Sequence, residues 1–273
     1  MIAGSDVPGR ITRIPGGVAM NIAMTLRDFG MTPALLSAVG QDDPGDELIE
    51  AAQAMGLITN HIYMSKKLPT DVYMAIEGAN GLIAAIADAH SLEAAGHEIL
   101  RPLQDGRLGT VEAPWSGPIA LDGNLTTDLL EHIKTSAFFA QSDLRVAPAS
   151  PGKADRLLAL VGHPTATFYV NLEEANTLCG ANFETSTLAA NALILQGIYR
   201  AAVTNGAQDA TIATAKGQVT NTPPTVTARR ITGAGDTFMA AHIAAEMQGA
   251  PDATALARAL QAAAVYVSGE KPA

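Results

Sequence analysis

The sequence is poor in cysteine and has neither long hydrophobic runs nor a recognisable export signal. Cys179 is the single cysteine among 273 residues, so no disulfide can form within the chain, as is typical of a reducing compartment. No segment approaches about twenty uninterrupted apolar residues, and the first residues lack the basic start and apolar core of a signal peptide. We therefore expect a cytoplasmic protein with no membrane partner.

Positive charge is also scarce. The chain has 17 Lys and Arg residues against 27 Asp and Glu residues, a formal net charge of −10, and no basic cluster long enough to follow a phosphate backbone. We therefore expect no nucleic-acid partner. A single nucleotide stays compatible with this charge, because a local group of backbone N–H donors does not need a positive surface around it.

Helices and strands alternate along most of the chain. Residues 18–29 predict a helix that stops at Gly30, and residues 33–39 predict a buried strand. Further strand–helix pairs are predicted from 118–122, from about 167–170 and from 201–204. This order predicts one α/β domain over residues 1–273, with a mainly parallel sheet and ligands at the carboxyl ends of its strands. The residues at such ends are Asp122, Asn124, Asn171 and Gly206.

One stretch interrupts the alternation. Residues 71–77 and 82–87 predict a β-hairpin whose turn, Gly78-Ala79-Asn80-Gly81, suits positive φ angles. Residues 10–14 predict a third strand beside it, so that segments 6–15 and 71–87 would form a small sheet that acts as a lid. Its apolar face would need a partner, which predicts a homodimer.

The segment from Ile231 to Met239 points most directly to chemistry. Gly233 and Gly235 flank Ala234, and Asp236 follows just before a long apolar helix. Glycines let backbone N–H groups converge, and a helix N-terminus adds its dipole, so the segment suits an anion. A carboxylate beside an anion site is unfavourable unless it takes a proton from an attacking hydroxyl, which indicates phosphoryl transfer. The alternative is a plain loop in which Asp236 caps the helix.

Three weaker motifs lie elsewhere. Gly16, Gly17 and Asn21 open the first helix and could approach a sugar, or form an ordinary glycine-rich helix start. Asn171 and Glu174 could hold water around Mg²⁺, or form a capping box, and the two interpretations are compatible. Thr204 and Gly206 could face a nucleotide or mark a simple exit from a strand.

The order of these motifs resembles that of the ribokinase-like (PfkB) carbohydrate kinases over essentially the whole chain. Besides the motifs above, the resemblance rests on Ser37-Ala38-Val39-Gly40-Gln41-Asp42 and Gly45. Within the family, residues 5–11 and 36–40 look most like pseudouridine kinases. The resemblance implies a three-layer α/β sandwich with a mainly parallel central sheet and a small β-sheet lid that often mediates dimers.

The resemblance also implies roles for individual residues. Asp236 would be the catalytic base, and the N–H groups of Gly233, Ala234 and Gly235 would form the anion hole. Gly16, Gly17, Asn21, Asp122 and Asn124 would bind the substrate. Thr204, Gly206 and Thr232 would bind ATP, and Asn171 and Glu174 would hold Mg²⁺ through water.

The chain departs from the family pattern in three places. The apolar first strand, with the Asp that holds sugar hydroxyls, is expected to be missing, because the chain starts Met1-Ile2-Ala3-Gly4. Arg230 stands where the family commonly carries Asp or Asn, and Asp209 stands where the family usually carries glycine. These two differences would change any monovalent-cation site.

The resemblance thus implies an ATP-dependent kinase that converts pseudouridine to its 5′-phosphate. One alternative is a kinase of a free sugar or another nucleoside, and a second is a truncated, non-catalytic binder of nucleotide or sugar.

Overall fold

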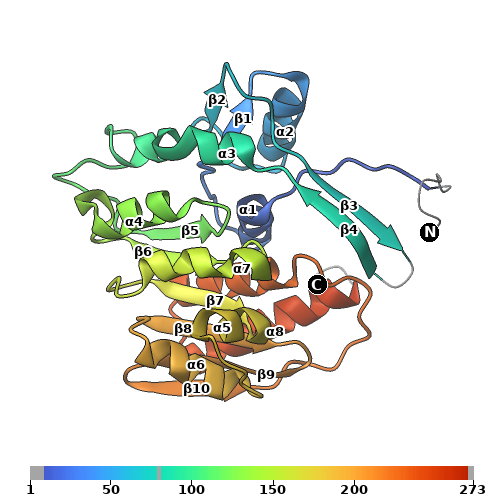
Figure 1. Ribbon diagram of the computed structural model, residues 1–273, viewed down its shortest axis with the longest axis vertical. Coiled ribbons are helices and arrows are strands. Elements are labelled where there is room, and N and C mark those ends of the chain that lie inside the picture. Colours follow the sequence, from blue (N-terminus) through green and yellow to red (C-terminus); the bar gives the residue numbers. More distant parts are fainter. Residues whose placement is uncertain (1–8, 79–80, 270–273) are drawn as a thin grey trace.

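A six-stranded sheet forms the centre of the computed structural model, which describes residues 9–78 and 81–269 (Figure 1). Its strand order is β10-β9-β8-β7-β6-β5. The strands are β5 (Pro118–Asp122), β6 (Asp143–Ala147), β7 (Thr167–Asn171), β8 (Arg200–Asn205), β9 (Gln208–Thr214) and β10 (Gly217–Asn221). Strands β5 to β8 are parallel, whereas β9 and β10 are antiparallel to their neighbours. The predicted mainly parallel sheet is confirmed.

Helices cover both faces of this sheet. Because successive residues of a strand point to opposite faces, Phe168 and Val170 of β7 pack in one buried cluster and Tyr169 in another. The first cluster lies beneath α4 (Thr127–Thr135), the 3-10 helix η3 (Pro151–Leu160), α5 (Leu172–Cys179) and α6 (Ser186–Leu195). The second lies beneath α1 (Val18–Asp28), α7 (Ala234–Met247) and α8 (Asp252–Ser268). The result is a three-layer arrangement.

A second, two-stranded parallel sheet does not pair with the large one. It consists of β1 (Ala38–Gly40) and β2 (Tyr63–Ser65), with α2 (Asp43–Ala54) between them in the chain. The predicted strand over 33–39 is therefore much shorter than expected, with only an isolated bridge at Ala34 before it. Helices α3 (His90–Ala95), η1 (Gly96–Leu103) and η2 (Ala137–Phe139) complete the described helices.

The predicted hairpin is present as β3 (Tyr73–Gly78) and β4 (Gly81–Ala87), and it projects from the body of the molecule (Figure 1). Residues 79 and 80 of its turn lie outside the described residues. The third lid strand expected over residues 10–14 is wrong: residues 9–16 contain no strand, and residues 6–8 lie outside the described part. With two strands, the hairpin cannot bury its own apolar side chains, which leaves Val72, Ile83 and Ile86 more than half exposed.

Among the described residues no strand precedes α1, so β5 is an edge strand of the large sheet. No helix in the described part of the chain is long and apolar enough to cross a bilayer.

Candidate active site

Asn21 and Asp236 are 215 residues apart in the sequence and meet in the structure. Asn21 lies in the first turn of α1, and its Nδ2 donates a 2.8 Å hydrogen bond to Oδ2 of Asp236, in the first turn of α7. The two helices pack against each other on the same face of the sheet. The predicted substrate motif and the predicted catalytic loop therefore form one site.

Burial raises the pKa of Asp236 to about 6, the hydrogen bond from Asn21 opposes this rise, and the negative charge of Asp122 adds to it. A carboxylate with a pKa just below neutrality is mostly ionised at pH 7 and is also a stronger base than an exposed aspartate. This is the protonation behaviour that proton abstraction from an alcohol requires.

The raised pKa of Asp236 predicts a pH profile. Since the base acts when deprotonated, kcat/KM should fall about tenfold per pH unit below about pH 6 and level off above it. Initial rates of ADP release between pH 4.5 and 8.5, in buffers of constant ionic strength, measure this fall in kcat/KM. A fall that begins only near pH 4 would mean that Asp236 is not the titrating base.

The backbone at the start of α7 is held by an aromatic residue. Gly233 has φ +91°, and a Cβ added there would lie 2.5 Å from Oη of Tyr266. That hydroxyl donates a 2.8 Å hydrogen bond to the carbonyl oxygen of Thr232. Arg230 lies over the Tyr266 ring at 3.7 Å and donates to its carbonyl oxygen. The loop therefore needs glycine at 233.

The three amides predicted to bind an anion are not equivalent. The N–H of Ala234 already donates to the carbonyl oxygen of Ile231 at 3.0 Å. Within the described residues, no backbone hydrogen bond uses the N–H of Gly233 or Gly235, and nothing lies within 4 Å of where a Cβ on Gly235 would be. Gly233 and Gly235, with the helix dipole, thus have the donors to hold an anion.

Asp122 and Asn124 lie at the carboxyl end of β5, as predicted. The backbone N–H of Asn124 donates to Oδ1 of Asp122 at 2.8 Å. Burial raises the pKa of Asp122, while hydrogen bonds from Asn124 and from the backbone of Ala19 in α1 oppose the rise. These contacts join β5 to the glycine-rich start of α1.

Two basic residues also contact Asn124 at this end of the site, and neither was predicted from the sequence. Nζ of Lys153 donates to Oδ1 of Asn124 at 2.7 Å, and Arg156 donates to the carbonyl oxygen of Asn124 at 2.8 Å. Both come from η3, and Arg156 also pairs with Glu93 of α3 at 2.9 Å. The segment carries no motif, so its approach to β5 is visible only in the fold.

Asn171 and Glu174 form a capping box at the start of α5. Each backbone N–H donates to the other side chain at 2.8 Å. Burial, opposed by the backbone hydrogen bond from Asn171 and helped by the charges of Glu173 and Asp236, raises the pKa of Glu174 to about 7. The predicted capping box is therefore confirmed. The magnesium role stays a prediction, and the described residues contain no cluster of three metal-ligating side chains.

One of the three predicted nucleotide residues, Thr204, lies beside this capping box. Thr204 of β8 lies opposite Asn171 of β7 in the sheet register, and Gly206, with φ +55°, forms the exposed turn to β9. Thr232 is exposed.

Gly16 and Gly17 are also exposed, and nothing lies within 4 Å of an added Cβ at either, so the start of α1 is open to a ligand. Among the described residues, no hydrogen bond or ion pair joins Thr204 or Gly206 to Asp236.

Comparison with known proteins places the whole chain in one group. A family profile described as "pfkB family carbohydrate kinase" matches residues 4–272. The pseudouridine kinase of Arabidopsis thaliana is 26% identical over 206 residues, which cover 73% of this chain and 52% of that protein. The pseudouridine kinase of Escherichia coli (strain K12) is 28% identical over 253 residues, which cover 89% of this chain and 77% of that protein.

This chain thus spans about half the length of its Arabidopsis relative. Among solved structures, a candidate ribokinase II from E. coli in complex with ATP and Mg²⁺ superimposes with a TM-score of 0.78 at 20% identity, covering 96% of this chain and 86% of the other. The ribokinase-like fold is therefore confirmed. Together with the profile match over nearly every residue, this shows that the chain belongs to the pfkB family of carbohydrate kinases.

Proposed function

We propose that this chain transfers the γ-phosphoryl group of ATP to the 5′-hydroxyl of a ribonucleoside, with pseudouridine as the preferred acceptor. The observation that carries the proposal is the hydrogen bond between Asn21 and Asp236 beside the open start of α7. The names of two curated relatives support the choice of nucleoside.

In this mechanism Asp236 accepts the proton of the acceptor hydroxyl. The hydroxyl oxygen forms a bond to the γ-phosphorus while the bond from that phosphorus to the β–γ bridging oxygen breaks, and ADP leaves. The N–H groups of Gly233 and Gly235 and the dipole of α7 stabilise the charge on the transferred phosphoryl oxygens. Asn21 orients the carboxylate.

The acceptor would lie between Asp236 and the end of β5. Gly16 and Gly17 leave room for a ribose, and Asp122 and Asn124 offer acceptors for its hydroxyls. Lys153, which donates to Asn124, would be available to donate a hydrogen bond to a polar group of the acceptor. Positioning by these groups would contribute a large part of the rate.

Thr204, Gly206 and Thr232 would contact ATP, and Asn171 and Glu174 would hold Mg²⁺ through water. The capping box engages only Oε2 of Glu174, so its second carboxylate oxygen can accept from a metal-bound water. Bound Mg²⁺ would neutralise phosphate charge. Arg230 places a fixed positive charge next to the loop, which disfavours a monovalent cation there.

A substrate panel tests the acceptor. With labelled ATP, phosphoryl transfer to pseudouridine should exceed transfer to uridine, adenosine, ribose and fructose. A higher kcat/KM for ribose or fructose would identify a sugar kinase of the same family. Binding of ATP and nucleoside without ADP release would identify a non-catalytic binder and end the kinase proposal.

We also expect a homodimer through the hairpin β3–β4. Val72, Tyr73, Ile83 and Ile86 are each more than half exposed, an apolar surface that association would bury. Light scattering at micromolar concentration should give twice the mass of 28.1 kDa, and Ile83→Glu should shift it toward the monomer. A monomeric wild-type protein would exclude this interface.

A further inference from the structure

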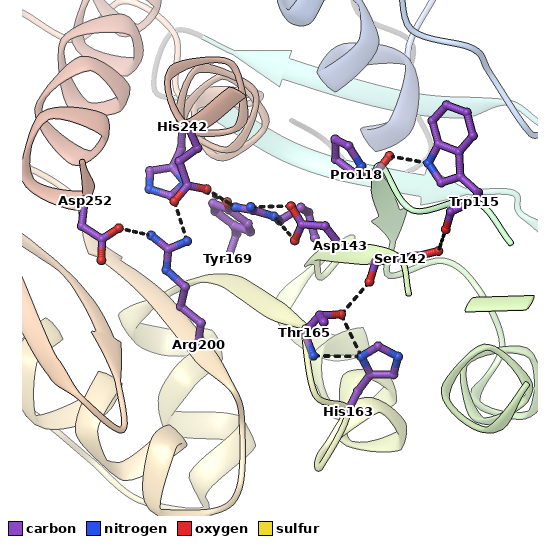
Figure 2. A network of polar contacts seen from close by, with 12 residues as sticks. Trp115, Pro118, Ser142, Asp143, His163, Thr165, Tyr169, Arg200, His242 and Asp252 are labelled. Carbon is purple, nitrogen blue, oxygen red and sulfur yellow. Dashed lines mark hydrogen bonds and ion pairs between the residues drawn. The ribbon is translucent and has the colours of Figure 1, made fainter. Parts of the chain in front are cut away.

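The helix that carries Asp236 is also tied to the sheet by a buried polar cluster, which we call the α7 cluster (Figure 2). Its five members are Arg145 of β6, Tyr169 of β7, Arg200 of β8, and His242 and Glu246 of α7. All but Glu246 are at least 92% buried, and His242 is completely buried.

The contacts of the α7 cluster run from the sheet to the helix. Oη of Tyr169 lies 2.8 Å from Nδ1 of His242 and accepts from Nη1 of Arg145 at 2.9 Å. Glu246 pairs with Arg145 and, at 2.5 Å, with Arg200. At the rim, Asp143 and Asp252 hold the outer nitrogens of the two arginines. The helix is therefore bonded to three neighbouring strands.

The donors and acceptors fix the direction of the central hydrogen bond. Arg145 donates to Oη, and Nδ1 of His242 is the remaining partner of Oη in the described residues, so we assign the tautomer in which the Tyr169 hydroxyl donates to Nδ1. His242 is then neutral with its proton on Nε2, which has no partner in the described residues. Burial lowers the pKa of His242 to about 4 and raises that of Tyr169 to about 12, in agreement with this assignment.

Two features separate this cluster from ordinary core packing. An unpartnered N–H on a fully buried histidine opposes folding, and apolar side chains of similar volume would avoid it. The neighbouring residues of α7, Ala240, Ala241, Ala244 and Ala245, are small and buried. Small side chains fill space without setting the rotation of a helix, whereas directional hydrogen bonds set it.

The cluster also joins the two elements that carry the two halves of the candidate site, β7 and α7. Tyr169 is two residues before Asn171 on β7, and His242 is six residues after Asp236 on α7. The hydrogen bond between Tyr169 and His242 therefore connects the strand that ends at the capping box with the helix that begins at the candidate base.

We propose that the Tyr169–His242 hydrogen bond, backed by the ion pairs of Glu246, positions α7 so that Asp236 faces the acceptor hydroxyl. Tyr169 is thus a positioning residue that acts through Asp236. This inference rests on the proposed kinase activity, and nothing in it requires Tyr169 to touch a substrate.

The test is Tyr169→Phe, which keeps the ring and removes the hydroxyl. We expect kcat to fall about tenfold while the KM for ATP stays within about twofold, because misplacement of the base slows the chemical step only. In the Asp236→Asn background the same change should alter kcat by less than about twofold, since the group through which it acts is gone.

Thr211→Val is the matched control. Thr211 is fully buried in β9, and its hydroxyl bonds to Ser186, Thr187 and Thr220, away from α7. It should lower the melting temperature without lowering kcat. An equal fall of kcat in this control, an unchanged kcat in Tyr169→Phe, or the same factor in both backgrounds would each overturn the proposal.

Hydrogen exchange distinguishes failure of this inference from failure of the kinase proposal. In Tyr169→Phe, amides of residues 233–241 should exchange faster relative to the rest of the protein, and in Thr211→Val they should not. This readout needs no activity. If the wild-type protein transfers no phosphate, faster exchange at residues 233–241 in Tyr169→Phe alone still supports the conclusion that the cluster fixes the position of α7. Equal exchange in the two variants refutes that conclusion.

Discussion

Asp236→Asn is expected to lower kcat by about 10²–10⁴-fold, the contribution of a general base. Asparagine has nearly the same shape and can still accept the hydrogen bond from Asn21, so the site should keep its geometry. ATP affinity, measured by calorimetry, should change little. Since burial disfavours the ionised carboxylate, the variant should also melt at a temperature equal to or above that of the wild type.

Asp128→Asn is a suitable control for the Asp236 variant. Asp128 is an exposed residue in the first turn of α4, and it also loses a helix-terminal charge on substitution. Its turnover should match the wild type. Unchanged turnover in Asp236→Asn would remove this residue from the mechanism, and loss of ATP affinity would assign it to binding rather than proton transfer.

Gly233→Ala should produce the second large loss. A methyl group would lie 2.5 Å from Oη of Tyr266, at a φ of +91° that alanine adopts with difficulty. Because Arg230 stacks on the Tyr266 ring and the Tyr266 hydroxyl is bonded to Thr232, we expect the strain to displace the loop, so that its N–H groups leave the position where the phosphoryl charge develops. We expect kcat to fall by about 10²–10³-fold, the range for loss of an oxyanion-type donor.

Gly249→Ala separates backbone strain from displacement of the loop. Gly249 has a φ of +79°, but nothing lies within 4 Å of an added Cβ. This control should lose stability through strain and keep its turnover. Tyr266→Phe should restore part of the activity to Gly233→Ala by removing the clashing oxygen. Equal turnover in Gly233→Ala and the wild type would mean that the loop does not stabilise the transferred group.

The sequence predicted the parts of the fold that depend on local pattern. Glycine pairs, helix periods and the polar ends of strands indicated the parallel strands, the start of α7 and the capping box of Asn171 and Glu174. The hydrogen bond between Asn21 and Asp236 could be expected only through the family resemblance, because nothing local links residues 215 positions apart.

Other features depend on tertiary contacts that have no local pattern. Lys153 and Arg156 lie on a 3-10 helix that approaches β5 through the packing of its apolar side, so their types and spacing gave no sign of a site. The predicted strand at residues 10–14 has suitable residue types, but Ile11 and Ile14 are almost fully exposed in the structure and pair with no strand. β-propensity reflects such pairing more than an intrinsic preference.

The edge position of β5 has a consequence for handling the protein. Strands β6 to β8 are almost entirely buried, as expected for a parallel sheet, whereas Ile119 and Ala120 of β5 are only half-buried. The side of β5 away from β6 presents backbone N–H and C=O groups that can pair with a strand of another molecule. Pro118 removes one donor at the start of this edge, and we expect the remaining N–H and C=O groups to favour strand addition between molecules in concentrated solutions.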